Sequence, residues 1–167
     1  ALSLAKMIGP GAEGRLTTLT QMIMDATKQA IHQELAFSVG LVETVIEYRL
    51  DHPEVPELPE MMAELGQHFQ SKNDVFSARR CFETASKGFA LSNRDLLAVK
   101  MTVAVAQTWI SEAELRGEQT HPIVAQNALE NALQIYRSIP GAFRAEFEVD
   151  KVLPVLRKRL EETDQRL

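Results

Sequence analysis

Apolar side chains recur every three or four residues between residues 62 and 85, and this spacing constrains the fold more than any other feature of the chain. In the first half, Met62, Leu65 and Phe69 fall on one face of an α-helix. A polar break at residues 71–74 contains an asparagine and an aspartate, residue types that end one helix and begin the next. The stretch therefore predicts two short amphipathic helices folded back on each other.

The second half of this stretch places small residues on either side of one large aromatic. Ala78, Phe82 and Ala85 are separated by four and three residues, so they share a helical face. In the first half Gly66 lies beside Leu65, where the missing side chain lets another helix approach closely. We expect Phe82 to fill the space that Gly66 and the two alanines leave.

Together these positions give the pattern Leu-Gly, aromatic, Ala, aromatic, Ala, which resembles the signature of a tetratricopeptide repeat (TPR). The match covers one hairpin, residues 59–90, and departs from the family at Met62, where Trp is usual, and at Ala90, where Pro is usual. An unrelated helical hairpin with a seam of small residues is the alternative interpretation. The residues that carry the resemblance are Leu65, Gly66, Phe69, Ala78, Phe82 and Ala85.

Helical spacing also predicts the other elements, and we expect an all-α fold within a single domain of 167 residues. The segment 95–116 is apolar on more than one side, which is typical of a helix buried between neighbours. The segment 122–138 repeats the small–large–small seam with Ala125, Leu129 and Ala132. A short TPR-like α-solenoid of stacked antiparallel hairpins is predicted, with an irregular helical bundle as the alternative. Its seven helices would be 12–30, 35–50, 59–72, 74–90, 95–116, 122–138 and 149–166.

Composition excludes several classes of function. A net charge of −5 argues against general nucleic-acid binding. The single cysteine, Cys81, excludes an internal disulfide and a cysteine-based zinc site, and no two of the four histidines have the i, i+4 spacing of a helical metal site. No apolar run approaches the ~20 residues that span a bilayer. We expect a cytoplasmic protein with no cofactor or metal. The chain starts without methionine and ends within a helical pattern, so we also expect a longer parent protein.

No grouping of side chains predicts catalysis, so we expect a protein that is not an enzyme. Arg116 and His121 have the Arg-x4-His spacing of the HEPN ribonuclease motif, but Gly117 follows the arginine and Pro122 follows the histidine. We interpret the pair as a helix end and a loop residue. The basic run at 157–159 is most simply a solvated helix face.

A second resemblance covers residues 53–167. Four runs in order are similar to an uncharacterised all-helical domain of bacterial proteins, which lies N-terminal to another domain that is sometimes HEPN-like. The resemblance implies an auxiliary or sensing module and supplies no active residues. An RNA-directed or toxin- and defence-associated module is the alternative function. The four runs are ARRCFETASKGF, AVAQTWISEAELR, ALENALQIYRSIPG and VLPVLRKRLEE.

The TPR resemblance implies where a partner would bind, because in that family the first helix of each hairpin lines the concave surface. Here the corresponding positions are Glu60, Glu64, Gln67 and Gln70. Their amides suit hydrogen bonds to a peptide, and their carboxylates favour a basic partner. We therefore expect a non-catalytic interaction or scaffolding module that binds a peptide or a partner helix. Homodimerisation through exposed apolar ends of the stack is a further hypothesis.

Overall fold

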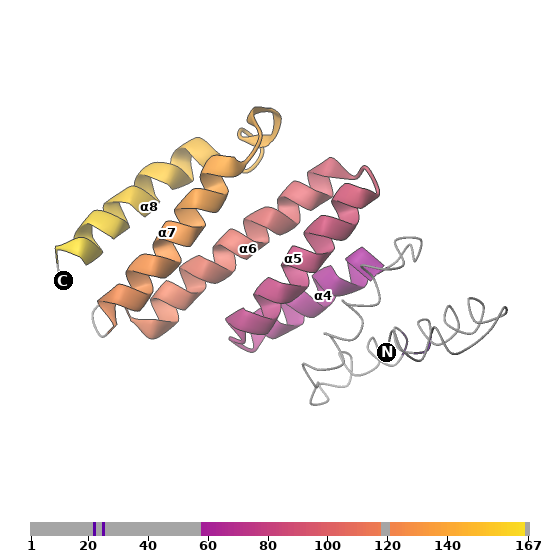
Figure 1. Ribbon diagram of the computed structural model, residues 1–167, viewed down its shortest axis with the longest axis horizontal. Coiled ribbons are helices and arrows are strands. Elements are labelled where there is room, and N and C mark those ends of the chain that lie inside the picture. Colours follow the sequence, from indigo (N-terminus) through magenta and orange to yellow (C-terminus); the bar gives the residue numbers. More distant parts are fainter. Residues whose placement is uncertain (1–21, 23–24, 26–57, 118–120, 166–167) are drawn as a thin grey trace, which may run out of the picture.

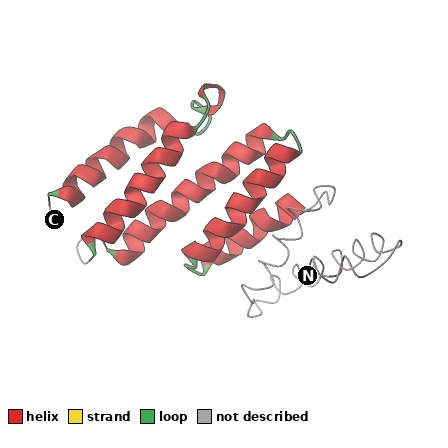
Figure 2. Ribbon diagram, in the orientation of Figure 1, coloured by secondary structure: helices red, strands yellow, loops and turns green. Residues whose placement is uncertain are grey.

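The computed structural model describes residues 22, 25, 58–117 and 121–165, and this part of the chain is helical with short connections and no β-strand (Figures 1 and 2). The all-α class predicted from the sequence is confirmed. Of the predicted helices 12–30 and 35–50, only Met22 and Asp25 lie within the described residues. The helices are α4 (Leu58–Ser71), α5 (Val75–Leu91), α6 (Asp95–Arg116), α7 (Pro122–Ser138) and α8 (Val149–Asp164), with a short 3-10 helix, η1 (Gly141–Phe143), before α8.

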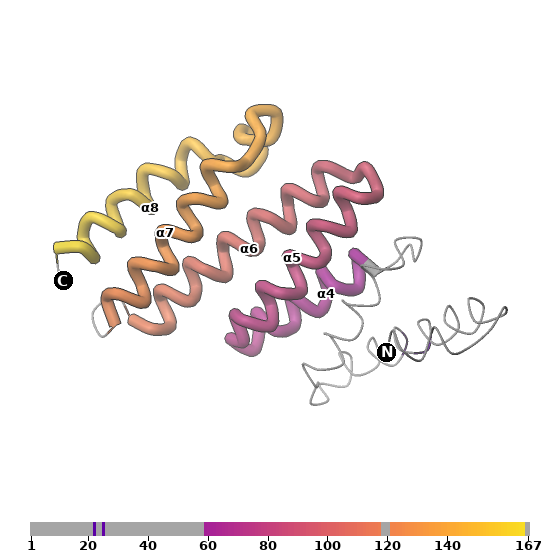
Figure 3. The backbone as a smooth tube through the Cα atoms, in the orientation of Figure 1, coloured from indigo at the N-terminus to yellow at the C-terminus, as the bar shows by residue number. Residues whose placement is uncertain are grey.

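Helices that follow one another in the described part of the chain pack together, in the pairs α4 with α5, α5 with α6, α6 with α7 and α7 with α8. Consecutive helices run in opposite directions, and α6 lies between α5 and α7 (Figure 3). The described part of the molecule is therefore a row of antiparallel helices in which neighbours in sequence are neighbours in space.

Two apolar clusters meet at α6. The first cluster is formed by α4, α5 and one side of α6, which contributes Met101 and Val105. The second is formed by α7, α8 and the other side of α6, which contributes Ala106 and Ala113. Trp109 packs against both clusters. The burial of α6 between two neighbours, expected from its apolar circumference, is confirmed.

The turns before α5 and before α6 share one backbone design. Asn73 and Asn93 adopt positive φ angles of 60° and 56°, a conformation that asparagine tolerates better than most residues. The next residue donates its backbone N–H five residues back, from Asp74 to the carbonyl of Phe69 at 2.9 Å and from Arg94 to that of Phe89 at 2.9 Å. These bonds satisfy carbonyls at the helix ends and turn the chain back on itself.

The connection between α7 and α8 spans residues 139–148. It contains η1 and ends at Glu148, which has a left-handed conformation with φ 49°. Pro154 is the sixth residue of α8 and is exposed. Because proline has no N–H, the carbonyl four residues earlier loses its helical partner on the solvent side of α8.

The hairpins α4–α5 and α6–α7 share a spacing of buried residues. In both, a glycine or alanine on the first helix is followed 12 residues later by a small residue on the second helix. A large residue comes 4 residues after that one, and another small residue comes 3 residues later still. Each residue of the second set lies 47 positions after its counterpart, and the seven apart from Gly66 are at most 1% exposed. The first set is Gly66, Ala78, Phe82 and Ala85, and the second is Ala113, Ala125, Leu129 and Ala132.

Candidate functional site

The six residues of the TPR-like signature lie together between α4 and α5. Gly66 and Phe82 make the closest approach, since a Cβ atom added at Gly66 would lie 2.5 Å from Cε1 and 2.6 Å from Cδ1 of the Phe82 ring. Phe82 itself is 1% exposed. The aromatic ring therefore occupies the space that the glycine leaves, which is the contact expected from the sequence. Leu65, Phe69, Ala78 and Ala85 are buried in the same cluster.

The four residues predicted to line a partner groove lie on α4, but they are not equivalent. Glu64 and Gln67 are exposed, whereas Glu60 and Gln70 are partly buried. Because Glu60, Glu64 and Gln67 are spaced by four and three residues, they share one face of the helix. Glu64 and Gln67 are thus the members of the set that solvent, or a partner, reaches most freely.

Glu60 is engaged within the protein. Its Oε1 accepts a hydrogen bond from Nη1 of Arg94, the residue that precedes α6, and the two side chains form an ion pair. Its second oxygen, Oε2, is buried with no hydrogen-bond partner in the described structure. The Arg94 guanidinium also lies 4.8 Å from the centre of the Phe89 ring. Glu60 therefore ties α4 to the start of α6 and is a poorer candidate for partner binding than Glu64.

A polar cluster between α5 and α6 was not predicted from the sequence. Arg79, 8% exposed, donates from Nε to Oγ1 of Thr108 at 3.1 Å and from Nη2 to Oε2 of Glu112 at 2.5 Å. Its guanidinium carbon lies 3.1 Å from the centre of the Trp109 ring. The Thr108 hydroxyl donates in turn to the carbonyl of Val105 at 2.7 Å. The charge of Arg79 is thus balanced by Glu112, and its donors are directed by residues of α6.

A signal for this cluster is present in the sequence. An arginine lies within the Ala78–Phe82 seam, and the apolar helix 95–116 carries Thr108, Trp109 and Glu112 within one turn. A charged residue inside a seam requires a partner on the facing helix, because an unpaired buried charge is strongly unfavourable. The pattern does not say which helix faces it.

The other chemical candidates find ordinary structural roles. Cys81 is buried, and desolvation raises the pKa of its thiol from 9.0 to about 12, which disfavours the nucleophilic thiolate. Arg116 is the last residue of α6, and His121 precedes α7 and donates its backbone N–H to the carbonyl of Gly117 at 3.0 Å. Residues 118–120 between them lie outside the described part.

The basic run on α8 is partly neutralised by carboxylates. Arg159 pairs with Glu114 of α6 at 3.2 Å, and Lys158 pairs with Glu162 at 3.7 Å. The described residues contain no group of three His, Cys, Asp or Glu side chains able to hold a metal ion. No helix among them is both long enough and apolar enough to cross a bilayer.

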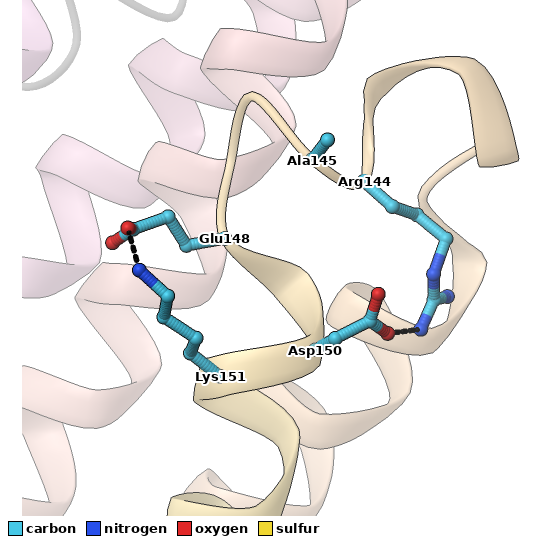
Figure 4. A pocket seen from close by; sticks show the side chains of 5 residues that line it. All are labelled: Arg144, Ala145, Glu148, Asp150 and Lys151. Carbon is cyan, nitrogen blue, oxygen red and sulfur yellow. Dashed lines mark hydrogen bonds and ion pairs between the residues drawn. The ribbon is translucent and has the colours of Figure 1, made fainter.

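A small open depression of about 160 Å³ lies where the η1 connection enters α8 (Figure 4). Two ion pairs flank it, from Arg144 to Asp150 at 2.6 Å and from Lys151 to Glu148 at 2.5 Å. Its fifth lining residue is Ala145. Because its four charged groups pair with one another, the depression has no net charge to attract an ionic ligand.

Comparisons with known proteins give no family assignment: no protein-family model matches the sequence, and neither the curated proteins nor the solved structures yield a match. Function is therefore inferred from the geometry of the chain itself. Two features stand out in that geometry. One is the exposed face of α4 at Glu64 and Gln67, and the other is the Arg79 cluster between α5 and α6.

Proposed function

We propose that this chain is a non-catalytic protein-interaction module built from stacked TPR-like helical hairpins. The observation that carries the proposal is the spacing of 12, 4 and 3 residues between buried positions, which occurs in both α4–α5 and α6–α7. A recurring unit that buries its seam against the next unit is the physical basis of solenoid proteins, whose extended surfaces bind other macromolecules. The packing of each described helix on its sequence neighbours supports the same interpretation.

The binding face of such a stack would include the exposed side of the first helix of each hairpin. On α4 its centre is Glu64 and Gln67, and the positions 47 residues later on α6 are Ser111 and Glu114. Glu114 is exposed and Ser111 is partly buried. We propose that these carboxylate, amide and hydroxyl groups hold a basic peptide or a basic partner helix.

The charges on this face determine the expected specificity. Glu64 presents a solvated carboxylate, which attracts lysine and arginine side chains, while the Gln67 amide both donates and accepts hydrogen bonds. Glu114 is shared with Arg159, so its attraction for a partner is smaller than that of Glu64. The proposal therefore assigns the largest electrostatic contribution to Glu64.

A peptide-selection experiment tests the proposal. A displayed library of random 16-residue peptides is selected on the wild-type protein, and the enriched peptides are titrated against Glu64→Lys and Glu83→Lys. Glu83 is exposed on α5 of the same hairpin, so its reversal is a matched control for net charge. An exposed ion pair contributes up to about 1 kcal/mol, or about fivefold in affinity, and charge reversal adds repulsion to the loss of that attraction, so we expect Glu64→Lys to weaken binding by about fivefold or more.

The selected peptides should be rich in lysine and arginine, and Glu83→Lys should leave their affinity unchanged. Circular dichroism of both variants checks that the helical content is retained. Equal affinity of the peptides for the wild type and for Glu64→Lys would exclude this face of α4. If the selection enriches peptides no more on this protein than on an unrelated helical protein, the proposed interaction function is contradicted as a whole.

A further inference from the structure

We propose that Arg79 and its partners form a polar clamp that fixes the angle between the α4–α5 hairpin and the α6–α7 hairpin. Arg79 belongs to α5, and the residues it contacts, Thr108, Trp109 and Glu112, all belong to α6. The cluster therefore spans the junction between the two hairpins, where α5 and α6 lie side by side (Figure 1). This inference concerns the shape of the stack and does not depend on which partner, if any, the α4 face binds.

The chemistry of the cluster suits orientation better than stabilisation. Apolar packing is non-directional, so a purely apolar junction tolerates small rotations and shifts of one helix along another. A guanidinium is planar and directs its N–H groups at fixed angles, and here it donates to two residues while stacking on a third. Removing Arg79 from water offsets much of the attraction to Glu112, so the cluster adds little net stability relative to an apolar contact.

A second directional contact lies further along the same two helices. Ser86 of α5 donates to the carbonyl of Ala98 at 2.9 Å and hydrogen bonds with the Thr102 hydroxyl at 3.0 Å. Ser86 is seven residues beyond Arg79, which places the two contacts about 10 Å apart along α5. Two directional contacts separated along one helix restrict both its rotation and its sliding against the neighbouring helix. A single contact would still allow the helix to rotate about that point.

The clamp has a direct consequence for the shape of the molecule. The α4–α5 and α6–α7 hairpins meet at the α5–α6 junction, so the angle set there determines how the exposed faces of α4 and α6 are placed relative to each other. Loss of the clamp should leave each hairpin folded while broadening the distribution of angles between them.

Distances between spin labels on the two hairpins test this inference. Labels are attached at Gln67→Cys on α4 and Glu130→Cys on α7, both exposed positions, in a Cys81→Ala background. Arg79→Met removes the directional donors and keeps an unbranched apolar side chain. We expect Arg79→Met to widen the label-to-label distance distribution about twofold relative to the Cys81→Ala background, in which the clamp is intact. The only tryptophan of the chain, Trp109, provides a second readout, since loss of the stacked guanidinium should change its emission.

Two comparisons separate orientation from general loss of stability. Asp74→Ala removes a helix cap within the first hairpin and should leave the distribution as narrow as in the background. The double variant Arg79→Met/Glu112→Met makes the junction apolar without leaving a carboxylate unpaired. Its melting temperature should lie within a few degrees of the background value, while its label-to-label distance distribution should stay wide. A narrow distribution in both Arg79 variants would overturn the proposal. Failure of the double variant to fold would also overturn it, because the cluster would then be required for folding itself.

Discussion

Replacing Gly66 with alanine sets two effects of opposite sign against each other. Gly66 lies inside α4, where alanine is favoured over glycine by about 1 kcal/mol because it loses less backbone entropy. The added methyl group would, however, lie 2.5 Å from Cε1, 2.6 Å from Cδ1 and 2.9 Å from Cζ of Phe82. All three distances are far below van der Waals contact, so either the ring or the helix must move.

The space around the ring decides which effect is larger. Phe82 is 1% exposed and is surrounded by the cluster of α4, α5 and α6, so it cannot rotate into solvent. Forcing an extra carbon into a well-packed core costs about 1–3 kcal/mol. Subtracting the helix-propensity gain, we expect Gly66→Ala to destabilise the protein by about 1 kcal/mol, within a range of about 0–2 kcal/mol.

Urea denaturation followed by circular dichroism measures the effect, with a thermal midpoint lowered by about 2–4 °C for each kcal/mol in a chain of this size. Gly141→Ala is the matched control, because a Cβ atom at Gly141 meets nothing within 4 Å. The control should be neutral or slightly stabilising, since it restricts the unfolded chain without a clash. A Gly66→Ala protein more stable than the wild type by the full helix-propensity gain would refute the close packing of Phe82.

Three further predictions concern a cap, a thiol and a surface carboxyl. Asp74→Ala should lower the free energy of unfolding by about 1 kcal/mol in urea denaturation, because the carboxylate accepts the Ser77 N–H at 3.1 Å at the start of α5. Asp74→Asn should be much less destabilised than Asp74→Ala, because the amide oxygen can accept the same hydrogen bond. The Cys81 thiol should react with a disulfide reagent only as fast as the protein unfolds. Burial raises its pKa to about 12, so stability should also fall as the pH rises above 9.0, where the unfolded thiol ionises first. The hydrogen bond and charge of Lys151 lower the pKa of the Glu148 carboxyl below 4.5. By NMR, Glu148 should therefore titrate at a lower pH in the wild type than in Lys151→Met. The stabilisation that the Glu148–Lys151 pair gives should be lost as the pH falls through the folded-state pKa of Glu148.

Helix boundaries were predictable because they depend on local chemistry. The predicted ends of α6 and α7, at residues 95–116 and 122–138, coincide with those observed. Proline at the first position of α7 and asparagine before α6 act within a few residues of where they stand. The backbone just before α8 was not predictable from local chemistry, because Glu148 adopts a left-handed conformation that its residue type does not favour.

The partners of individual side chains were not predictable in the same way. Glu60 was expected to face a partner, yet it pairs with Arg94, 34 residues away, and Arg79 finds Glu112 33 residues away. Helical periodicity says which face of a helix is apolar, but not which height of the neighbouring helix a given residue meets. That height depends on the lengths of the turns and on the packing of the whole junction, so polar contacts between helices emerge only from the structure.

The two hairpins themselves offer the strictest test of how their seams pack. The first hairpin combines Gly66 with Phe82, and the second combines Ala113 with Leu129 at the equivalent positions. The side chains of Phe82, Ala113 and Leu129 are at most 1% exposed. A larger residue on the first helix thus accompanies a smaller one on the second, which keeps the filled volume similar. Gly66→Ala/Phe82→Leu should therefore be less destabilised than the sum of its single variants, with a coupling energy of about 0.5–3 kcal/mol in a double-mutant cycle. Additive effects would mean that positions 66 and 82 do not share the space in which a Cβ atom and the ring collide.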